Sequence, residues 1–131
     1  MAEGQCSVRV TRRIAAPPDE VWAALTEPES LRRWLSPGGA GGLEPGADLE
    51  LALGDEAPVR VRVRHLDPGR ALELDWDTDA DPSAVRFELE PDGAGGTRLV
   101  LDHSRLDERV GMRYMRHWPE ALERLQRGLG S

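Results

Sequence analysis

The chain has 131 residues, which is long enough for one domain and too short for two of the usual size. Hydrophobic residues make up 39% of it and charged residues 31%, a balance typical of soluble globular proteins. With 24 acidic residues against 17 basic ones, its net charge of −7 disfavours nucleic acids and anionic membrane surfaces as partners. No apolar run approaches the roughly 20 residues of a membrane span, and the amino terminus lacks the pattern of a secretory signal. We therefore expect a single domain, residues 1–131, in the cytoplasm.

The first third of the chain predicts a strand followed by two short helices. Residues 7–14 alternate apolar and polar side chains, the pattern of a half-buried strand. Prolines within residues 15–25 suit the first turn of a helix, where a missing backbone N–H costs nothing. Thr26 with Glu29 three residues later resembles a capping box that opens a second helix. The glycine- and proline-rich residues 36–46 then predict a loop.

The middle of the chain predicts an antiparallel meander. Short, turn-rich connections favour hairpins between consecutive strands. The segments that alternate with period two are residues 47–53, 58–66, 71–78, 84–90 and 97–103. Together with the first strand they make six strands.

One of these strands carries charges that need an explanation. In residues 58–66 the valines and His65 share one face, and Arg60, Arg62 and Arg64 occupy the other. The next strand presents acidic side chains on its own outer face, so cross-strand ion pairs explain the arginines without any ligand.

The remaining residues, 107–129, predict a long amphipathic helix. Its apolar stripe follows spacings of three and four and consists of Met115, Trp118, Leu122, Leu125 and Leu129. Pro119 lies inside this segment and predicts a kink or a break, because its ring clashes with the carbonyl one turn earlier. A sheet with one apolar face and a helix with one apolar stripe bury those surfaces against each other, which predicts an α+β fold.

Three motifs in this order resemble those of a known superfamily. They are IAAPPDEVWAALTEPESLRRWLSP at residues 14–37, GGTRLVLDHSRL at 95–106 and HWPEALERLQRGL at 117–129. The chain thus resembles the SRPBCC superfamily, also called START-like or helix-grip proteins, and within it the family of the activator of the ninety-kilodalton heat-shock protein ATPase. The resemblance implies a curved six-stranded antiparallel sheet around a long C-terminal helix, with two short helices between the first two strands.

The residue pattern offers little catalytic chemistry. A single cysteine, Cys6, excludes an internal disulfide and any zinc site built on several thiolates. The sequence contains no nucleophile paired with a base and no nucleotide-binding glycine motif. The three histidines lie on different predicted elements, which argues against a metal site. We assign no catalytic residue, no metal and no cofactor.

Aromatic side chains are the better indication of a site. Only six are present, and four of them are tryptophan. Trp34 precedes the glycine-rich loop, Trp76 and His103 end inward-facing strand positions, and Tyr114 lies beside two methionines early in the last helix. Trp22 belongs to ordinary helix packing, whereas His65 and His103 either emerge into water or line a cavity. The candidate ligand-binding residues are Trp34, Trp76, Phe87, His103, Tyr114 and Trp118.

Three functions fit this arrangement. The first is a binding or carrier protein for a small hydrophobic molecule, either a lipid or an aromatic metabolite, held in an apolar cavity between the sheet and the last helix. The second is an enzyme similar to polyketide cyclases and aromatases, in which His103, Tyr114 and Arg86 are the residues to test. The third is a protein partner, as in the chaperone activator. The same composition also allows a collapsed interior without an open cavity.

Overall fold

The computed structural model describes residues 5–34, 43–44, 46, 48–51, 59–78 and 81–129. The predicted loop at 36–46 lies largely outside these ranges. The elements in chain order are β1 (Gln5–Ile14), α1 (Pro18–Thr26), α2 (Pro28–Trp34), β2 (Asp48–Leu51), β3 (Val59–Asp67), β4 (Ala71–Thr78), β5 (Asp81–Pro91), β6 (Thr97–Asp107) and α3 (Glu108–Gly128).

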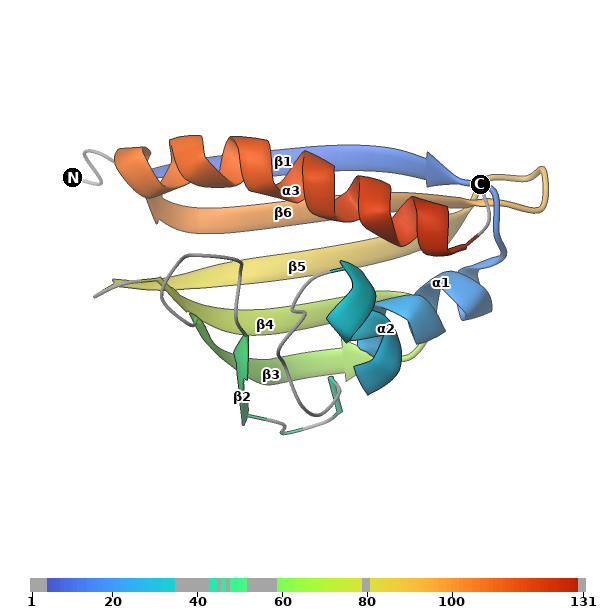
Figure 1. The fold of residues 1–131 in the computed structure, drawn as a ribbon, viewed down its shortest axis with the longest axis horizontal. Helices are drawn as coiled ribbons and strands as arrows, with labels where there is room; N and C mark the ends of the chain where they lie inside the picture. Colours follow the sequence, from blue (N-terminus) through green and yellow to red (C-terminus); the bar gives the residue numbers. More distant parts are fainter. Residues whose placement is uncertain are drawn as a thin grey trace.

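The strands form one antiparallel sheet in the order β1-β6-β5-β4-β3-β2. Strands β2 to β6 follow one another as a meander, and β1 pairs beside β6 (Figure 1). The six predicted strands are therefore five long ones and a four-residue edge strand, β2. The predicted class is confirmed: an antiparallel sheet, a long helix at the C-terminal end, and two short helices between β1 and β2.

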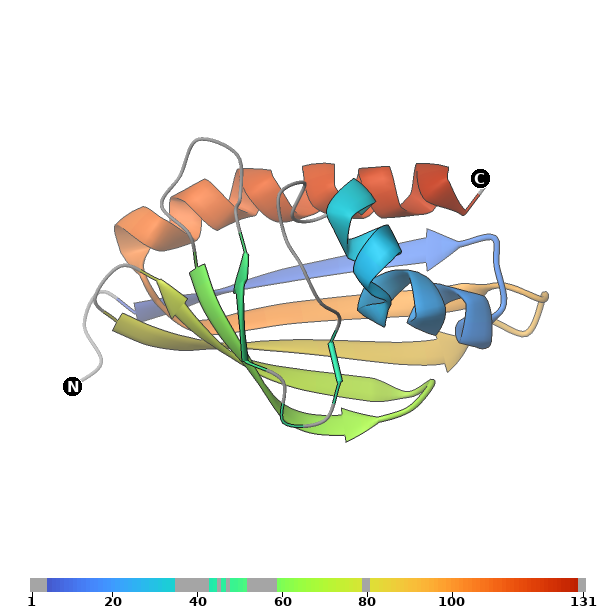
Figure 2. The same cartoon turned by 60° about the horizontal axis from the view of Figure 1, so that its bottom comes forward.

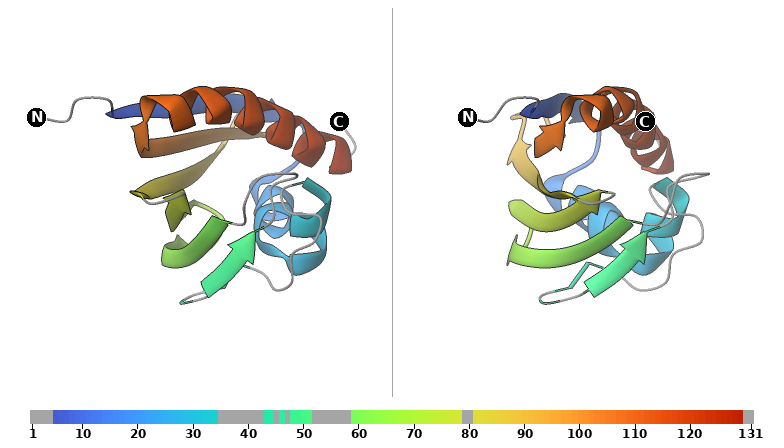
Figure 3. Two further views of the ribbon diagram at one scale, coloured as in Figure 1. Left: turned by 60° about the vertical axis from the view of Figure 1, so that its left-hand side comes forward. Right: turned by 90° about the vertical axis from the view of Figure 1, so that its left-hand side faces the viewer.

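The sheet curves around its helices. Figure 2 and Figure 3 show α3 lying along one side of the concave face, over β1 and β6, with α1 and α2 at one end. Phe87, Leu101 and Leu122, from β5, β6 and α3, are each 1% exposed or less, as the alternation of apolar residues predicts. The core therefore lies between the sheet and its last helix.

The helix α1 begins as predicted, whereas the capping box before α2 does not form. Pro18 occupies one of the first helical positions of α1 and Pro17 its N-cap. The hydroxyl of Thr26 donates back to the carbonyl of Trp22 at 2.9 Å instead of reaching forward to α2. A threonine in the last turn of a helix often makes this bond to the carbonyl four residues earlier.

A β-bulge in β3 turns His65 away from the face that it shares with the valines in the predicted strand. The pairing of β3 with β4 shifts between Val63 and His65. One extra residue in a strand reverses which face the following side chains occupy. His65 is therefore exposed and the next residue, Leu66, is half-buried against the core, so the cavity-lining alternative for His65 is wrong.

The outer face of the sheet carries cross-strand ion pairs, one with the expected strand β4 and two with β2. Arg60 and Arg62 lie opposite Asp77 and Asp75 in the register, but the guanidinium groups of both contact Asp48 on β2, at 3.5 and 3.4 Å. Arg64 pairs with Asp75 at 3.5 Å. These side chains are largely exposed, so each pair contributes little stability, and the arginine ladder needs no ligand.

The apolar stripe of α3 differs from the prediction at its N-terminal end. Tyr114, Trp118 and Leu122 are buried, whereas Met115 is 64% exposed and Met112 is 74% exposed. Since a helix turns about 100° per residue, Tyr114, one turn before Trp118, faces the sheet and Met115 falls at the flank of the stripe. The methionines are therefore surface residues in this helix.

None of the described helices combines the length and apolarity needed to cross a membrane.

Pro119 does not break α3: of the two predicted outcomes, a kink or a break, the break is wrong. The helix runs without interruption from Glu108 to Gly128. Trp118, Ala121 and Leu122, on either side of the missing hydrogen bond, are completely buried, and their packing holds both halves of the helix against the sheet. The carbonyl of Pro119 also accepts a hydrogen bond from the Arg12 guanidinium of β1 at 3.3 Å.

We expect Leu122→Ala to lower the free energy of unfolding by about 2–5 kcal/mol, because it removes buried methyl groups and leaves a cavity. The matched control is Met115→Ala on the exposed flank, which we expect to change stability by less than about 0.5 kcal/mol. Chemical denaturation measures both. Equal effects of the two substitutions would contradict the helix face described above.

Candidate functional site

The structure brings all six predicted site residues together between the sheet and α3. Five per cent or less of each of these residues is exposed. Trp34 comes from the end of α2, Trp76, Phe87 and His103 from neighbouring strands, and Tyr114 and Trp118 from α3. We call these six residues the aromatic cluster.

The rings of the aromatic cluster contact one another mainly edge to face. Trp118 lies at the centre, with ring centroids 5.2 Å from Trp76 and 6.2 Å from Phe87. Trp34 contacts the far edge of Phe87 at 6.2 Å, and His103 lies 4.7 Å from Tyr114. Edge-to-face pairs at these distances are favourable beyond the area they bury, so the cluster is a packed aromatic layer.

Strand alternation places the sheet members of the cluster. Trp76, Phe87 and His103 each occupy the inward-facing positions of their strands, and β4, β5 and β6 are hydrogen-bonded neighbours. Tyr114 and Trp118 are one helical turn apart and so present their rings to the sheet from the same face of α3.

A chain of hydrogen bonds runs through the apolar interior. The indole Nε1 of Trp118 donates to Nδ1 of His103 at 3.0 Å. An indole nitrogen only donates, so Nδ1 must be the unprotonated nitrogen and Nε2 carries the proton. Nε2 therefore donates to the hydroxyl oxygen of Ser83, 2.8 Å away, and that hydroxyl donates to the carbonyl of Trp76 at 2.5 Å.

The same interior is uncharged at neutral pH. Burial, reinforced by the nearby His117, lowers the pKa of His103 from its ordinary value of 6.5 to about 3. Nε1 of Trp76 donates to the phenolic oxygen of Tyr114 at 2.8 Å. The ring nitrogens of Trp76, His103 and Trp118 are thus all hydrogen-bonded within the interior, and none of them carries a formal charge.

Ser83 is the functional-site residue that sequence analysis missed. The predicted strand began at residue 84, whereas β5 begins at Asp81. Ser83 therefore shares the inward positions of Val85 and Phe87 and is buried. A serine in phase with buried apolar residues was the available signal, and the misplaced strand start concealed it.

The Ser83–His103 pair does not make a nucleophile. A general base must accept the hydroxyl proton, but Nε2 of His103 already carries a proton and the ring is a very weak base. Arg86, one of the three residues to test in an enzyme, lies on the outer face of the sheet, where it pairs with Glu73 and Glu88. Among the described residues, no group of three potential ligands could hold a metal ion.

A protein-family comparison identifies relatives of the chain. The family described as Activator of Hsp90 ATPase homolog 1-like protein matches residues 15–130. No curated protein matches the sequence significantly.

Solved structures resemble the whole fold. Protein MLL2253 from Mesorhizobium loti superposes with a TM-score of 0.86 at 26% identity, covering 95% of this chain and 97% of that one. DynU16, from the dynemicin biosynthetic locus, gives a TM-score of 0.83 at 27% identity, covering 95% of this chain but 47% of its own. CalU16 from Micromonospora echinospora gives 0.77 at 29% identity, covering 92% and 74%. This chain thus spans about half the length of DynU16.

We expect the buried imidazole to make stability depend on pH. The folded protein keeps His103 neutral down to a pKa of about 3, whereas the unfolded chain protonates it near 6.5. Between pH 6.5 and 3 the unfolded chain therefore binds a proton that the folded protein does not. As far as this group is concerned, the free energy of unfolding is highest above pH 6.5 and decreases as the pH falls toward 3. Denaturation at several pH values checks this, with His103→Gln as the variant that lacks this contribution. An NMR signal of His103 that titrates at its ordinary pKa would contradict an enclosed ring.

Proposed function

Because the chain belongs to the family of Activator of Hsp90 ATPase homolog 1-like proteins, within the SRPBCC superfamily, we propose that it binds a small apolar molecule between the sheet and α3. The ligand contacts the aromatic cluster and displaces part of its ring packing. The proposed site residues are Trp34, Trp76, Phe87, His103, Tyr114 and Trp118.

The observation that carries the proposal is an uncharged aromatic layer with an internal hydrogen-bond chain. Ring faces favour flat or apolar ligands, and small-molecule sites usually combine an apolar lining with a few fixed polar groups. The hydroxyl of Tyr114 supplies one such group, whereas His103, whose two ring nitrogens already bond to Trp118 and Ser83, contributes a neutral ring. A charged ligand would have to give up its hydration without an opposite charge, so the preferred ligand is neutral.

The edge of the layer at Trp34 is the expected entrance. Among the described residues, Trp34 meets the other rings through Phe87 alone, whereas Trp118 is held by rings on several sides. Separating Trp34 from Phe87 therefore disturbs less packing than opening the centre. The ligand would then lie against Phe87 and Trp118.

The ring packing of the aromatic cluster favours an aromatic metabolite as the ligand over a lipid, because aromatic rings pack favourably against one another. DynU16, 27% identical, belongs to the dynemicin biosynthetic locus. A cyclase-like reaction finds less support, because Arg86 lies outside the cluster and Ser83 lacks a base. The protein is accordingly proposed as a binding or carrier protein.

We expect a neutral polycyclic aromatic compound to shift tryptophan fluorescence on titration. Trp34→Phe and Trp76→Phe should each reduce the response, because their indoles lie in the aromatic cluster. Trp22→Phe should leave it intact, because Trp22 is a half-buried residue of α1 that packs elsewhere on the core. Loss of the response in Trp22→Phe alone, or its survival in both cluster variants, would contradict the proposed site.

The family description favours a second candidate function, the stimulation of a chaperone ATPase. Under this alternative, adding the protein to an Hsp90-type chaperone raises its rate of ATP hydrolysis. Unchanged hydrolysis at saturating protein, together with a ligand-dependent fluorescence shift, would leave ligand binding as the function.

A further inference from the structure

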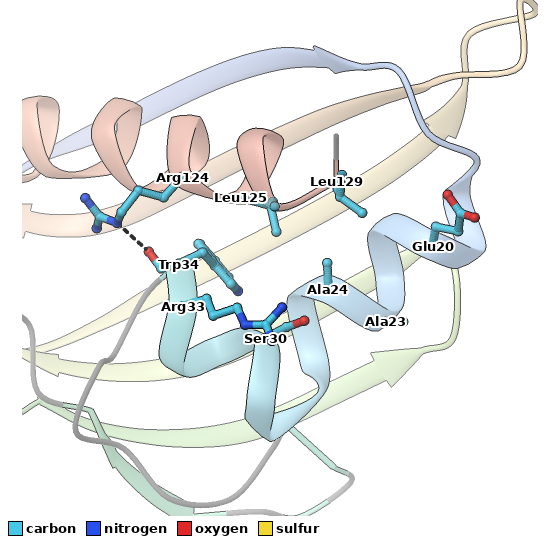
Figure 4. Close-up of a pocket in the computed structure, with 10 residues that line it drawn as sticks. Glu20, Ala23, Ala24, Ser30, Arg33, Trp34, Arg124, Leu125 and Leu129 are labelled. Carbon is cyan, nitrogen blue, oxygen red and sulfur yellow. Dashed lines mark hydrogen bonds between the residues drawn. The ribbon is translucent and has the colours of Figure 1, made fainter. Parts of the chain in front are cut away.

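A pocket lies outside the sheet–helix interface. Its volume is about 270 Å³, and it is surrounded by α1, α2 and the C-terminal end of α3 (Figure 4). Trp34 is the one residue that this pocket shares with the aromatic cluster. Since a cavity of about 150 Å³ accommodates benzene, the space fits a ligand somewhat larger than one aromatic ring.

The wall of the pocket is largely apolar. Ala23 and Ala24 line it from α1, and Leu125 of α3 and Leu129, directly after the end of α3, line it from the other side. Figure 4 shows both leucine side chains pointing toward α1. Small alanines on one side and leucines on the other leave a slot that suits an aliphatic chain.

An unsatisfied donor lies at the base of this slot. The indole Nε1 of Trp34 is buried and has no hydrogen-bond acceptor in the described part of the chain, although the residue is only 2% exposed. Figure 4 shows the indole reaching from α2 toward Ala24, with its nitrogen at the far end. The backbone of Trp34 is fixed separately, since its carbonyl accepts from Nε of Arg124 at 3.1 Å. A buried N–H without an acceptor destabilises a protein. A ligand oxygen that accepts from it therefore gains more binding free energy than one that bonds to a donor already satisfied.

A cation and a hydroxyl line the same pocket as that donor. Arg33 and Ser30 both line the pocket, and Figure 4 shows the Arg33 side chain running between Trp34 and Ser30. Arg33 approaches Glu29 only to 3.9 Å, and both side chains are more than 70% exposed. Such an exposed pair is weak, so Arg33 is free to turn toward a ligand and, in turning, to uncover the indole N–H.

We propose that this pocket binds a small aliphatic monocarboxylate. Its chain lies between Ala24, Leu125 and Leu129, and its carboxylate accepts hydrogen bonds from the Trp34 indole and the Arg33 guanidinium. The indole N–H and the guanidinium can only donate, and the Ser30 hydroxyl can also donate, which favours an anionic acceptor at this end; the one carboxylate among the lining residues, Glu20, comes from the first turn of α1. One negative charge matches one mobile guanidinium, whereas the more strongly hydrated phosphate is poorly suited to the apolar wall.

The experiment follows the four indole N–H signals of isotope-labelled protein by NMR during titration with octanoate. Trp34→Phe identifies the signal of Trp34. We expect that signal to move downfield with octanoate and to move little with octan-1-ol, which has the same chain without the charge. Arg33→Gln should weaken octanoate binding at least about tenfold through the loss of a charge-assisted hydrogen bond.

Arg32→Gln is the matched control, because it removes the same charge from the same helix outside the pocket. It should leave the affinity within about twofold. An unmoved Trp34 signal, an equal response to octan-1-ol, or equal losses in Arg32→Gln and Arg33→Gln would each overturn the proposal. Movement of the Trp76 and Trp118 signals with octan-1-ol, and of no indole signal with octanoate, would place a neutral ligand at the aromatic cluster, which also overturns this proposal while supporting the function proposed above.

Discussion

The attachment of α3 to the sheet through Trp118 is the contact on which the interior depends. Its indole is completely buried, packs against Trp76 and Phe87, and donates a hydrogen bond to His103. Burying the indole N–H would be costly without that acceptor, and burying the imidazole would be costly without that donor. The hydrogen bond between Trp118 and His103 therefore positions α3 against β6 and, with it, the ring layer.

That requirement also determines the chemistry of the interior. Once Trp118 occupies Nδ1 of His103, the proton must lie on Nε2, and Ser83 becomes its acceptor. The serine is thereby committed to the Trp76 carbonyl rather than to a substrate. A pair that looks like part of a hydrolase site is instead a structural link, and the layer it supports is neutral and apolar.

Trp34 connects this layer to a separate environment. Its ring packs edge to face against Phe87, and Trp34 also lines the pocket formed by the three helices. The two environments differ in charge, since the cluster holds a neutral histidine and the helical pocket is bordered by two arginines, Arg33 and Arg124, and one glutamate, Glu20. A neutral aromatic ligand and an aliphatic carboxylate are thus distinguished by electrostatics rather than by size alone.

The sequence by itself determined the elements and the inward positions of Trp76, Phe87 and His103, because alternation and helical periodicity are local properties of the chain. Only the tertiary structure decided the bulge that exposes His65, the continuity of α3 through Pro119, and the bond between Ser83 and His103. These depend on pairing register and on contacts between elements far apart in the chain, where packing outweighs local preference. The unsatisfied indole of Trp34 belongs to the same group: a sequence shows that a donor exists, and only packing decides whether an acceptor reaches it.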